Sequence, residues 1–300
     1  MANDRGDFAP HIRNSAWWAS DTRQAANGRA NEVILTKIGL KEPVDLSGVE
    51  KVQMGHVMEP VIGRLAEERL QINLKDAPYA LTHPKHDWLR SHFDFISTDG
   101  RVLVEAKNYS AQVRNKFDTE ANIIPQADMA QLIHEATVHG VERIILAVLF
   151  GGQEFCTFDF TITDQQKDQL IKDMAVYWGH VQAKNPLPPE TTEQTKLLYS
   201  TDDGSSISAN LHVERVAQAL KQVKLNIKAL EEQEEAMLTA IQSHMQSHSQ
   251  LLSADGAVLA TWKNSKASKR FNADLFKQAY PDLYSQFMTE SAGSRRFLLK

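Results

Sequence analysis

The chain has 300 residues, of which 42% are hydrophobic and 24% charged, which is enough for one sizeable core and an additional module. Its formal net charge of −5 argues against a protein that coats nucleic acid through charge alone, but it leaves room for an acidic enzyme site with a local basic lining. We expect no membrane span and no secretory signal, because the sequence lacks a long apolar run and begins with the polar segment M-A-N-D-R-G-D. A single cysteine, Cys156, excludes a disulfide framework and favours a reducing cytoplasm.

The N-terminal segment R-N-S-A-W-W-A-S-D, residues 13–21, places an arginine close to the start of a predicted helix. Ser20 followed by Asp21 is typical of a helix N-cap, and exposed N–H groups at a helix start favour phosphate. On pattern alone, Arg13 is an ordinary surface arginine and the two tryptophans pack in the core. The pattern predicts helices over residues 21–40 and 50–70.

Glu59 lies in the second of these helices and is followed by Pro60. Proline is awkward deep inside a helix but acceptable near its first turn. On pattern alone, Glu59 is a surface or capping acid.

Residues 93–107 combine a predicted hairpin with two acids and a lysine. T-D-G-R at 98–101 is a turn composition, and the β-branched, apolar run that follows it predicts a buried strand. Alternation along that strand places Glu105 and Lys107 on the same side, with Asp94 across the hairpin. Hard divalent cations such as Mg²⁺ take oxygen ligands, and an ammonium beside them can orient a water or stabilise a phosphate. The plainer reading is a salt-bridged hairpin with solvated edge residues.

The next elements complete a predicted α/β core. A polar loop from residue 108 to 124 leads to a helix that begins at Pro125, ends at Gly140 and carries Gln131. Gln131 is either a core-edge amide or a group beside bound metals. The apolar run at 141–150 predicts a central strand, residues 154–161 alternate as the next strand, and residues 164–184 form an amphipathic helix.

The remainder of the chain has a different character. Residues 190–210 are polar and predict a linker, and residues 213–241 show a heptad pattern that predicts an exposed helix. That helix either joins a coiled coil or packs on its own domain. The tail pattern predicts a strand over 256–263 that pairs with a strand over 295–300, and a helix over 274–289 between them. A basic cluster there either touches DNA or forms a solvated rim.

Four motifs together resemble one nuclease family. The D-x10-E-x-K pattern of Asp94, Glu105 and Lys107 resembles the PD-(D/E)xK nuclease core, with Phe93 where that pattern often has proline. The Arg13-x6-Ser20 segment, G-H-V-M-E at 55–59 and M-A-Q-L at 129–132 are similar to further motifs of the lambda-exonuclease-like, or YqaJ-type, viral recombinase family. The order and spacing of these motifs are more specific than any one of them.

The resemblance implies roles for the acidic residues. Asp94 and Glu105 would hold Mg²⁺, with Mn²⁺ as a substitute and the Ala106 carbonyl as a further ligand. Lys107 would orient or activate the attacking water. Glu59 and Gln131 would complete the site.

The resemblance also implies a phosphate-binding group. Arg13 and Ser20 would help to bind DNA phosphate, with a terminal 5′-phosphate as one option. His92 departs from the small residue that is common there in the family. It either contacts the scissile or terminal phosphate or lies at a strand edge.

The function that the resemblance implies is a Mg²⁺-dependent 5′-to-3′ exonuclease on double-stranded DNA ends, which leaves 3′ single-stranded overhangs for phage-type recombination. It also implies a ring-shaped homo-oligomer, with a trimer as one option, a single-strand annealing protein as partner, and a phage or prophage origin in the bacterial cytoplasm. One alternative is a restriction-like endonuclease. Another is a non-catalytic DNA-binding scaffold, although a scaffold has no need of all three motif residues Asp94, Glu105 and Lys107.

The expected fold is therefore α/β. It has a PD-(D/E)xK nuclease core, a mixed central sheet flanked by helices, in residues 1–189. A linker follows at 190–210, then a helical arm at 211–252 and a small α+β module at 253–300.

Overall fold

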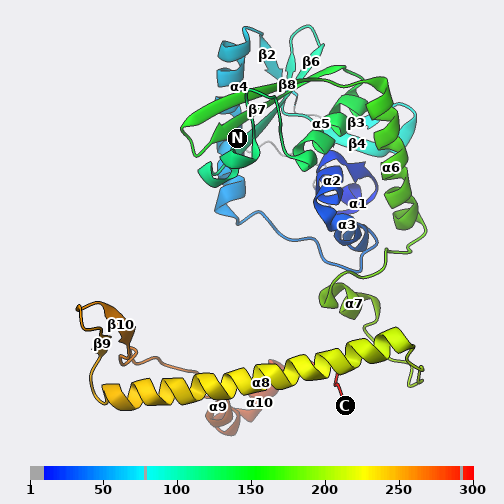
Figure 1. The fold of residues 1–300 in the computed structure, drawn as a ribbon. Helices are drawn as coiled ribbons and strands as arrows, with labels where there is room; N and C mark the ends of the chain where they lie inside the picture. Colours follow the sequence, from blue (N-terminus) through cyan, green and yellow to red (C-terminus); the bar gives the residue numbers. More distant parts are fainter. Residues whose placement is uncertain (1–9, 78–79, 291–292) are drawn as a thin grey trace. The chain divides into compact units, whose positions relative to one another are not determined.

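The computed structural model describes residues 10–77, 80–290 and 293–300 (Figure 1). The chain divides into two compact units, Met1–Tyr199 and Ser200–Lys300. Among the described residues, no helix combines the length and the apolar character needed to cross a bilayer.

A five-stranded mixed sheet forms the centre of the first unit. Its strands lie in the order β2 (Leu74–Asp76), β5 (Phe95–Ser97), β6 (Val102–Tyr109), β7 (Arg143–Phe150) and β8 (Glu154–Thr161). Strands β6 and β7 are parallel and pair over eight residues, from Val102 opposite Arg143 to Tyr109 opposite Phe150, while the other neighbours are antiparallel. The predicted hairpin and both predicted strands after it are confirmed.

Helices cover both faces of this sheet, as Figure 1 shows. Helix α4 (Glu50–Leu70) places Ile62 and Ala66 in one apolar cluster with alternate residues of the strands, such as Val104 and Ile145. Helix α5 (Gln126–His139) and helix α6 (Asp164–Gln182) contribute to the larger cluster on the other face. Because the central strands are buried on both faces, they read as continuous apolar runs. The predicted α/β class with a mixed sheet flanked by helices is confirmed.

A second, smaller sheet lies beside α5 and includes one strand from the N-terminal segment. Its strands are β1 (Trp17–Trp18), β4 (His86–His92) and β3 (Ala80–His83), with β1 parallel to β4. Around it lie α1 (Pro10–Asn14), α2 (Ala19–Gln24), the π-helical segment η2 (Ala25–Arg29) and α3 (Ala30–Lys37). The helix predicted over 21–40 is therefore interrupted, because Gly28 has a φ of 77° inside η2.

The prediction of Ser20 as a helix N-cap is wrong. The N-cap of α2 is Trp18, not Ser20, because the Asp21 carboxylate accepts the Trp18 backbone N–H at 2.8 Å and begins the helix two residues earlier. The helix predicted over 50–70 is confirmed as α4, and Pro60 lies in its interior. Packing of the α4 face against the sheet offsets the hydrogen bond that proline removes, since tertiary packing supplies most helix stability.

The connecting segments contain two short helices that the sequence pattern does not predict. The 3₁₀ helix η3 (Ala111–Lys116) lies in the loop after β6. Helix α7 (Thr192–Leu198) lies inside the stretch assigned to a linker, and its buried Gln194 accepts a hydrogen bond from Asn31 at 3.0 Å. The four-part division of the chain stays a prediction.

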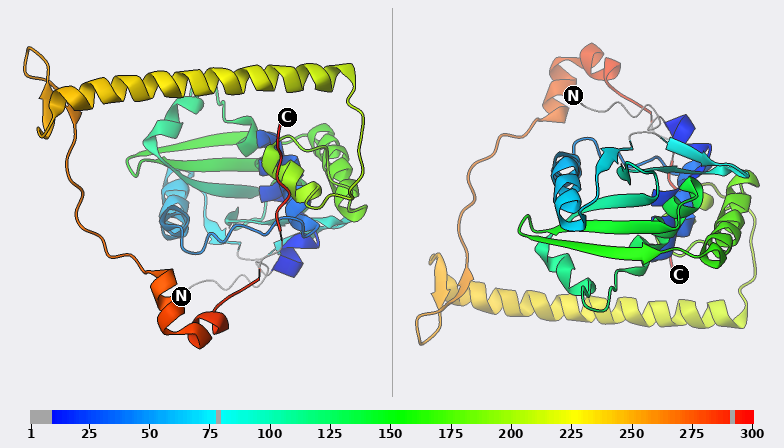
Figure 2. Two further views of the ribbon diagram at one scale, coloured as in Figure 1. Left: turned by 90° about the horizontal axis from the view of Figure 1, so that it is seen from below. Right: turned by 90° about the horizontal axis from the view of Figure 1, so that it is seen from above.

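The second unit begins with the long helix α8 (Leu211–Met245), which Figure 2 shows as one continuous element. Strand β9 (Gln250–Leu252) pairs antiparallel with β10 (Val258–Thr261), and α9 (Ala273–Ala279) and α10 (Pro281–Gln286) follow. The predicted pairing of the first tail strand with residues 295–300 is wrong, because β9 lies closer in sequence and closes a much shorter loop. The helix predicted over 274–289 is divided at Tyr280, since Pro281 cannot donate to continue it.

Gly63 allows α4 to approach the sheet closely. A Cβ added there would lie 2.6 Å from the ring of Phe95, whereas one added at Gly55 on the same helix meets no atom within 4 Å. We expect Gly63→Ala to lower the free energy of unfolding by about 1–3 kcal/mol, because the overpacked helix must shift. Gly55→Ala should leave it unchanged or raise it by about 1 kcal/mol, as alanine favours the helix. Urea unfolding followed by tryptophan fluorescence measures both, and equal effects of the two changes would contradict this account of the helix–sheet contact.

Candidate active site

The hairpin brings the first two acids together. Phe95 lies opposite Val104, so Asp94 stands at the end of the short strand, level with the residues that follow Val104. The Asp94 carboxylate accepts the backbone N–H of Ala106 at 2.9 Å. The predicted convergence of Asp94 with the acidic end of β6 is therefore present, and a main-chain hydrogen bond holds it.

The face of β6 that looks toward α5 carries Glu105 and Lys107. Lys107 donates to the Glu105 carboxylate through its ammonium group. Gln131 of α5 donates its amide N–H groups to Glu105 at 2.6 Å and to Glu135 at 2.8 Å. Glu105, Gln131 and Glu135 are all buried. Two carboxylates thus share one amide donor beside one ammonium.

The electrostatics of this cluster reflect an excess of acid. Burial raises the pKa of Asp94 well above its usual range, and the charges of Glu105 and Glu59 raise it further. Burial, followed by the charge of Glu105, likewise raises the pKa of Glu135. Burial opposes the charge on Lys107, but Glu105 and Asp94 together raise its pKa above the ordinary value. Lys107 is therefore a firmly held cation among more carboxyl groups than it can neutralise.

Glu59 approaches the cluster from the opposite face of the sheet. It lies on α4, its carboxylate is 3.9 Å from the imidazole of His56, and its charge is close enough to raise the pKa of Asp94. The structure therefore brings Asp94, Glu105, Lys107, Glu59 and Gln131 into one neighbourhood, from β6 and from helices on both sides.

The donor set fits a hard cation. In the part of the chain that the structure describes, no three His, Cys, Asp or Glu side chains form a preassembled metal-binding group. Mg²⁺ does not require one, because it commonly binds through one or two carboxylates and completes its shell with water and substrate phosphate. Asp94 and Glu105 supply such oxygens. The raised pKa of Asp94 indicates that an additional positive charge nearby would stabilise its ionised form.

A second cluster surrounds the indole of Trp18. The guanidinium groups of Arg13 and Arg90 each lie 4.9 Å from its ring centroid, and His92 stacks on it at 4.9 Å. Arg13 also donates to the Ser20 hydroxyl at 2.9 Å. The three residues predicted to bind phosphate therefore meet around one buried aromatic side chain, and His92 lies two residues before Asp94.

A buried hydrogen-bond chain fastens this N-terminal segment to α5 and β4. Trp17 donates to the Thr22 hydroxyl at 3.0 Å, Thr22 lies 2.7 Å from His134 Nδ1, and His134 Nε2 lies 3.0 Å from the Arg90 carbonyl. Burial lowers the pKa of His134 to about 4, so the imidazole is neutral at physiological pH. A neutral ring that accepts from Thr22 and donates to the carbonyl satisfies every member of the chain.

Another polar group ties the end of β6 to α5. Tyr109 donates to the Asp128 carboxylate at 2.7 Å, and Arg23 of α2 donates to both residues at 2.9 Å. These contacts fix the strand end just beyond Lys107. Contacts before and after Lys107 on this face of β6 therefore hold the backbone that carries the ammonium.

Residues 12–142 match the model of the YqaJ-like viral recombinase domain. The matched segment includes every predicted site residue, from Arg13 to Gln131. The resemblance inferred from the four motifs is thus confirmed, and it supports a nuclease function for this part of the chain.

Solved structures with similar folds include two exonucleases. An alkaline exonuclease from Laribacter hongkongensis, LHK-Exo, is 10% identical with a TM-score of 0.47, over 58% of this chain and 91% of that chain. A phage-related exonuclease from Haemophilus somnus 129PT is 11% identical with a TM-score of 0.43, over 53% and 83%. No curated protein matches the chain. We draw no conclusion from similarities at this level. The fold of the first unit is described by its own sheet order and register.

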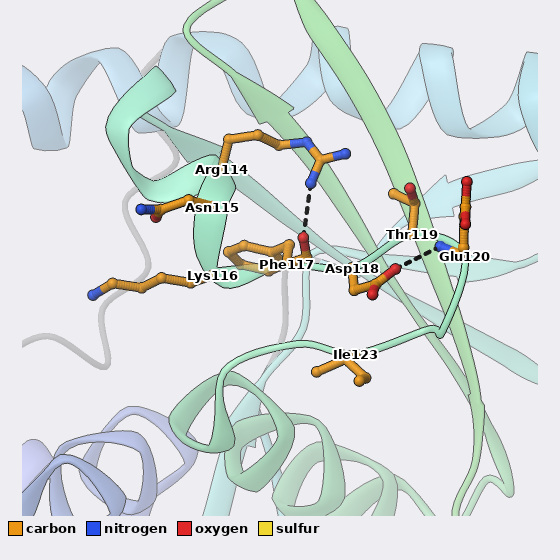
Figure 3. A pocket seen from close by; sticks show the side chains of 8 residues that line it. All are labelled: Arg114, Asn115, Lys116, Phe117, Asp118, Thr119, Glu120 and Ile123. Atoms are coloured by element: carbon orange, nitrogen blue, oxygen red, sulfur yellow. Dashed lines mark hydrogen bonds between the residues drawn. The ribbon is translucent and has the colours of Figure 1, made fainter.

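The loop after β6 forms a polar pocket of about 450 Å³ (Figure 3). Arg114 donates to the Phe117 carbonyl at 2.8 Å and to the Glu154 carboxylate at 2.7 Å, while Asp118 accepts the Glu120 N–H at 2.9 Å. None of the acidic-cluster residues lines this pocket. The candidate active site is therefore assigned from the chemistry of its side chains and not from the volume of a pocket.

Sequence reasoning missed two members of these clusters. Glu135 lies four residues after Gln131, so both project from one face of α5, and that spacing is the signal that would have found it. Arg90 reaches Trp18 because β1 pairs with β4, a contact between segments 72 residues apart that no local pattern contains. The roles of the predicted site residues stay predictions.

The crowding of carboxyl groups predicts an unusual pH dependence of stability. Because folding raises the pKa of Asp94 above its ordinary value of 3.8, the wild-type protein loses stability as the pH rises past that value. We expect Asp94→Asn to raise the thermal midpoint by a few degrees near neutral pH in EDTA, since the amide cannot ionise and its oxygen still accepts from Ala106. The gain should disappear near pH 4. Calorimetry across this pH range measures both effects.

Asp99 is the matched control. It is an exposed turn residue whose pKa is lowered by hydrogen bonds from Ser97 and from the Arg101 N–H. Asp99→Asn should therefore lower the thermal midpoint slightly at neutral pH, the opposite sign. If Asp94→Asn were no more stable than wild type at any pH, the crowding described above would not exist.

Proposed function

We propose that the chain is a Mg²⁺-dependent 5′-to-3′ exonuclease that acts on the ends of double-stranded DNA and leaves 3′ single-stranded overhangs for phage-type recombination. The observation that carries the proposal is the convergence of Asp94, Glu105 and Lys107 at one end of β6. The domain match supports the nuclease class. The direction of digestion and the overhang come from the family resemblance.

The side chains of the site would have separate roles in metal binding and in positioning. Asp94 and Glu105 are the residues that would hold Mg²⁺, or Mn²⁺ as a substitute, with the Ala106 carbonyl as a further ligand. A bound divalent cation would supply charge neutralisation at the phosphate and activation of the attacking water. Gln131 holds the Glu105 carboxylate in place by its 2.6 Å hydrogen bond, and Glu59 adds negative charge from α4.

Lys107 acts as a cation in this scheme. The neighbouring acids raise its pKa, so it donates hydrogen bonds and cannot take up a proton near neutral pH. It would orient the attacking water and stabilise the developing charge on the phosphate oxygens. This role explains why a lysine is placed between two acids rather than in solvent.

The cluster around Trp18 would bind DNA phosphate. Arg13 presents a planar guanidinium, which suits the geometry of phosphate oxygens, and it is already oriented by Ser20 and the indole. His92 connects this cluster to Asp94 along the chain. Binding of a terminal 5′-phosphate at Arg13 would select the 5′ end and place the next phosphodiester near the acids.

The substrate class and assembly follow from the same proposal. DNA ends would be the substrate, a ring-shaped homo-oligomer would be the working form, and a single-strand annealing protein would take over the overhang. A restriction-like endonuclease remains the second reading, because the D-x10-E-x-K cluster alone serves both activities. Closed circular DNA separates the two, since an exonuclease needs an end.

Lys107→Ala tests the catalytic assignment. We expect it to lower kcat for release of nucleotides from 5′-labelled linear duplex in Mg²⁺ by about 10²- to 10³-fold, because an electrostatic contact to the transition state is lost. Binding of duplex in Ca²⁺ should change little. EDTA should abolish wild-type digestion, and closed circular duplex should stay intact.

Lys172→Ala on the exposed face of α6 is the control and should digest DNA like wild type. A cut circle would favour the endonuclease. Full activity of Lys107→Ala would remove this site from the mechanism. Absence of any Mg²⁺-dependent digestion, with binding retained, would leave the non-catalytic scaffold.

Arg13→Ala tests end recognition. We expect KM for 5′-phosphorylated duplex to rise about tenfold, while KM for duplex with a 5′-hydroxyl changes little, because a charge-assisted phosphate contact contributes about 1.5–3 kcal/mol. Arg143→Ala, which removes a surface arginine paired with Asp159, is the control. An equal loss on both substrates would assign Arg13 to general backbone contact instead of the 5′-phosphate.

A further inference from the structure

The helix α8 presents a long apolar stripe that no described residue of its own unit buries. It has 35 residues, or about 52 Å at 1.5 Å per residue. Within it, as described, Met245 alone is buried. Seven apolar residues on the stripe are between 40% and 64% exposed: Val213, Val216, Val223, Ile227, Leu230, Met237 and Ile241. An exposed apolar surface of this length marks an interaction site.

The stripe follows a heptad repeat without interruption in spacing. With Leu220, the apolar residues alternate in steps of three and four from Val213 to Ile241, and Glu234 takes the one remaining position. Strict spacing of this kind favours the narrow seam of a coiled coil over packing on a broad domain surface. The repeat spans more than the three or four heptads that make the assignment secure.

Charge is segregated along the same helix. Residues 211–228 carry four basic side chains and one acidic one, whereas residues 229–245 carry four acidic side chains and no basic one. The helix macrodipole acts within the end turns and favours the opposite order, so the helix alone gives no reason for this distribution. A partner with the reversed order of charge would complement it along its whole length.

We infer that α8 pairs in antiparallel orientation with α8 of a second copy of this chain. Reversal of one copy lays its basic half along the acidic half of the other, and a pair centred near residue 228 brings Lys224 level with Glu231 of the second copy. Glu234 in the seam then faces the segment that carries Lys221 and Lys224. A parallel pair would instead place Glu234 against its own copy and set like charges side by side.

This pairing is independent of the nuclease site. It would join two protein chains through their arms and would add to any contact that the first units make. Its failure and the failure of the proposed activity are therefore separate results.

Distances between spin labels on the full chain test the orientation. One label replaces Ala229 and another, in a separate variant, replaces Gln218, both through a cysteine change in a Cys156→Ser background. The antiparallel pair predicts a short separation at Ala229, about 10–20 Å, and about 30 Å or more at Gln218. Short separations at both positions would show a parallel pair, and a long or absent dipolar signal at Ala229 would show that the helices do not pair. Either result overturns the inference.

Charge exchange tests the cause of the orientation. The combined changes Lys221→Glu, Lys224→Glu and Lys228→Glu should weaken self-association at least tenfold in sedimentation equilibrium and remove the short Ala229 separation. The further changes Glu231→Lys, Glu234→Lys and Glu235→Lys should restore both, because the complementarity is then reversed as a whole. Restoration also shows that the first variant was not simply unfolded. A first variant that associates like wild type, or a second that fails to recover while circular dichroism shows an intact helix, overturns the inference.

Discussion

The concentration of carboxyl groups around one ammonium is the constraint on which the rest of the first unit depends. Asp94, Glu105, Glu59 and Glu135 approach one another from a hairpin, a strand and helices on both faces of the sheet, and Lys107 supplies the one positive side chain among them. Burying like charges is costly, so the surrounding fold must hold them by other means. The apolar clusters on both faces of β6 and the amide of Gln131 provide that support.

The sequence predicted the parts of this arrangement that are local. The T-D-G-R turn sets the hairpin, and alternation along β6 puts Glu105 and Lys107 on one face, so three of the site residues follow from short-range rules. The helix bounds of α5 follow from the same kind of rule, since Gly140 ends it with a φ of 88°. The position of Glu59 near Asp94 could be predicted only from the motif resemblance, because the residue spacing along a helix does not show where that helix packs on a sheet.

The features that the sequence did not predict correctly have two kinds of physical cause. One helix start was misplaced because a side chain caps at an unexpected position, as Asp21 does for Trp18. At Pro60, inside α4, packing overrides a local preference. Contacts between distant segments were missed altogether, as with Arg90 at Trp18 and with the pairing of β9 and β10. The buried imidazole of His134 links α5 to α2 and β4, and the sequence of each element gives no sign of this contact.

Strand β7 lies outside the segment that matches the family model, although it completes the sheet beside β6. The matched segment ends at residue 142, one residue before β7 begins, yet β7 is the neighbour that pairs with β6 along its full length. A fragment cut at that boundary would leave the strand that carries Glu105 and Lys107 as an open sheet edge, with its apolar flanks exposed to water. Such an edge invites association with other chains, so the smallest autonomous form of this domain must extend past its recognisable motifs to include β7 and β8.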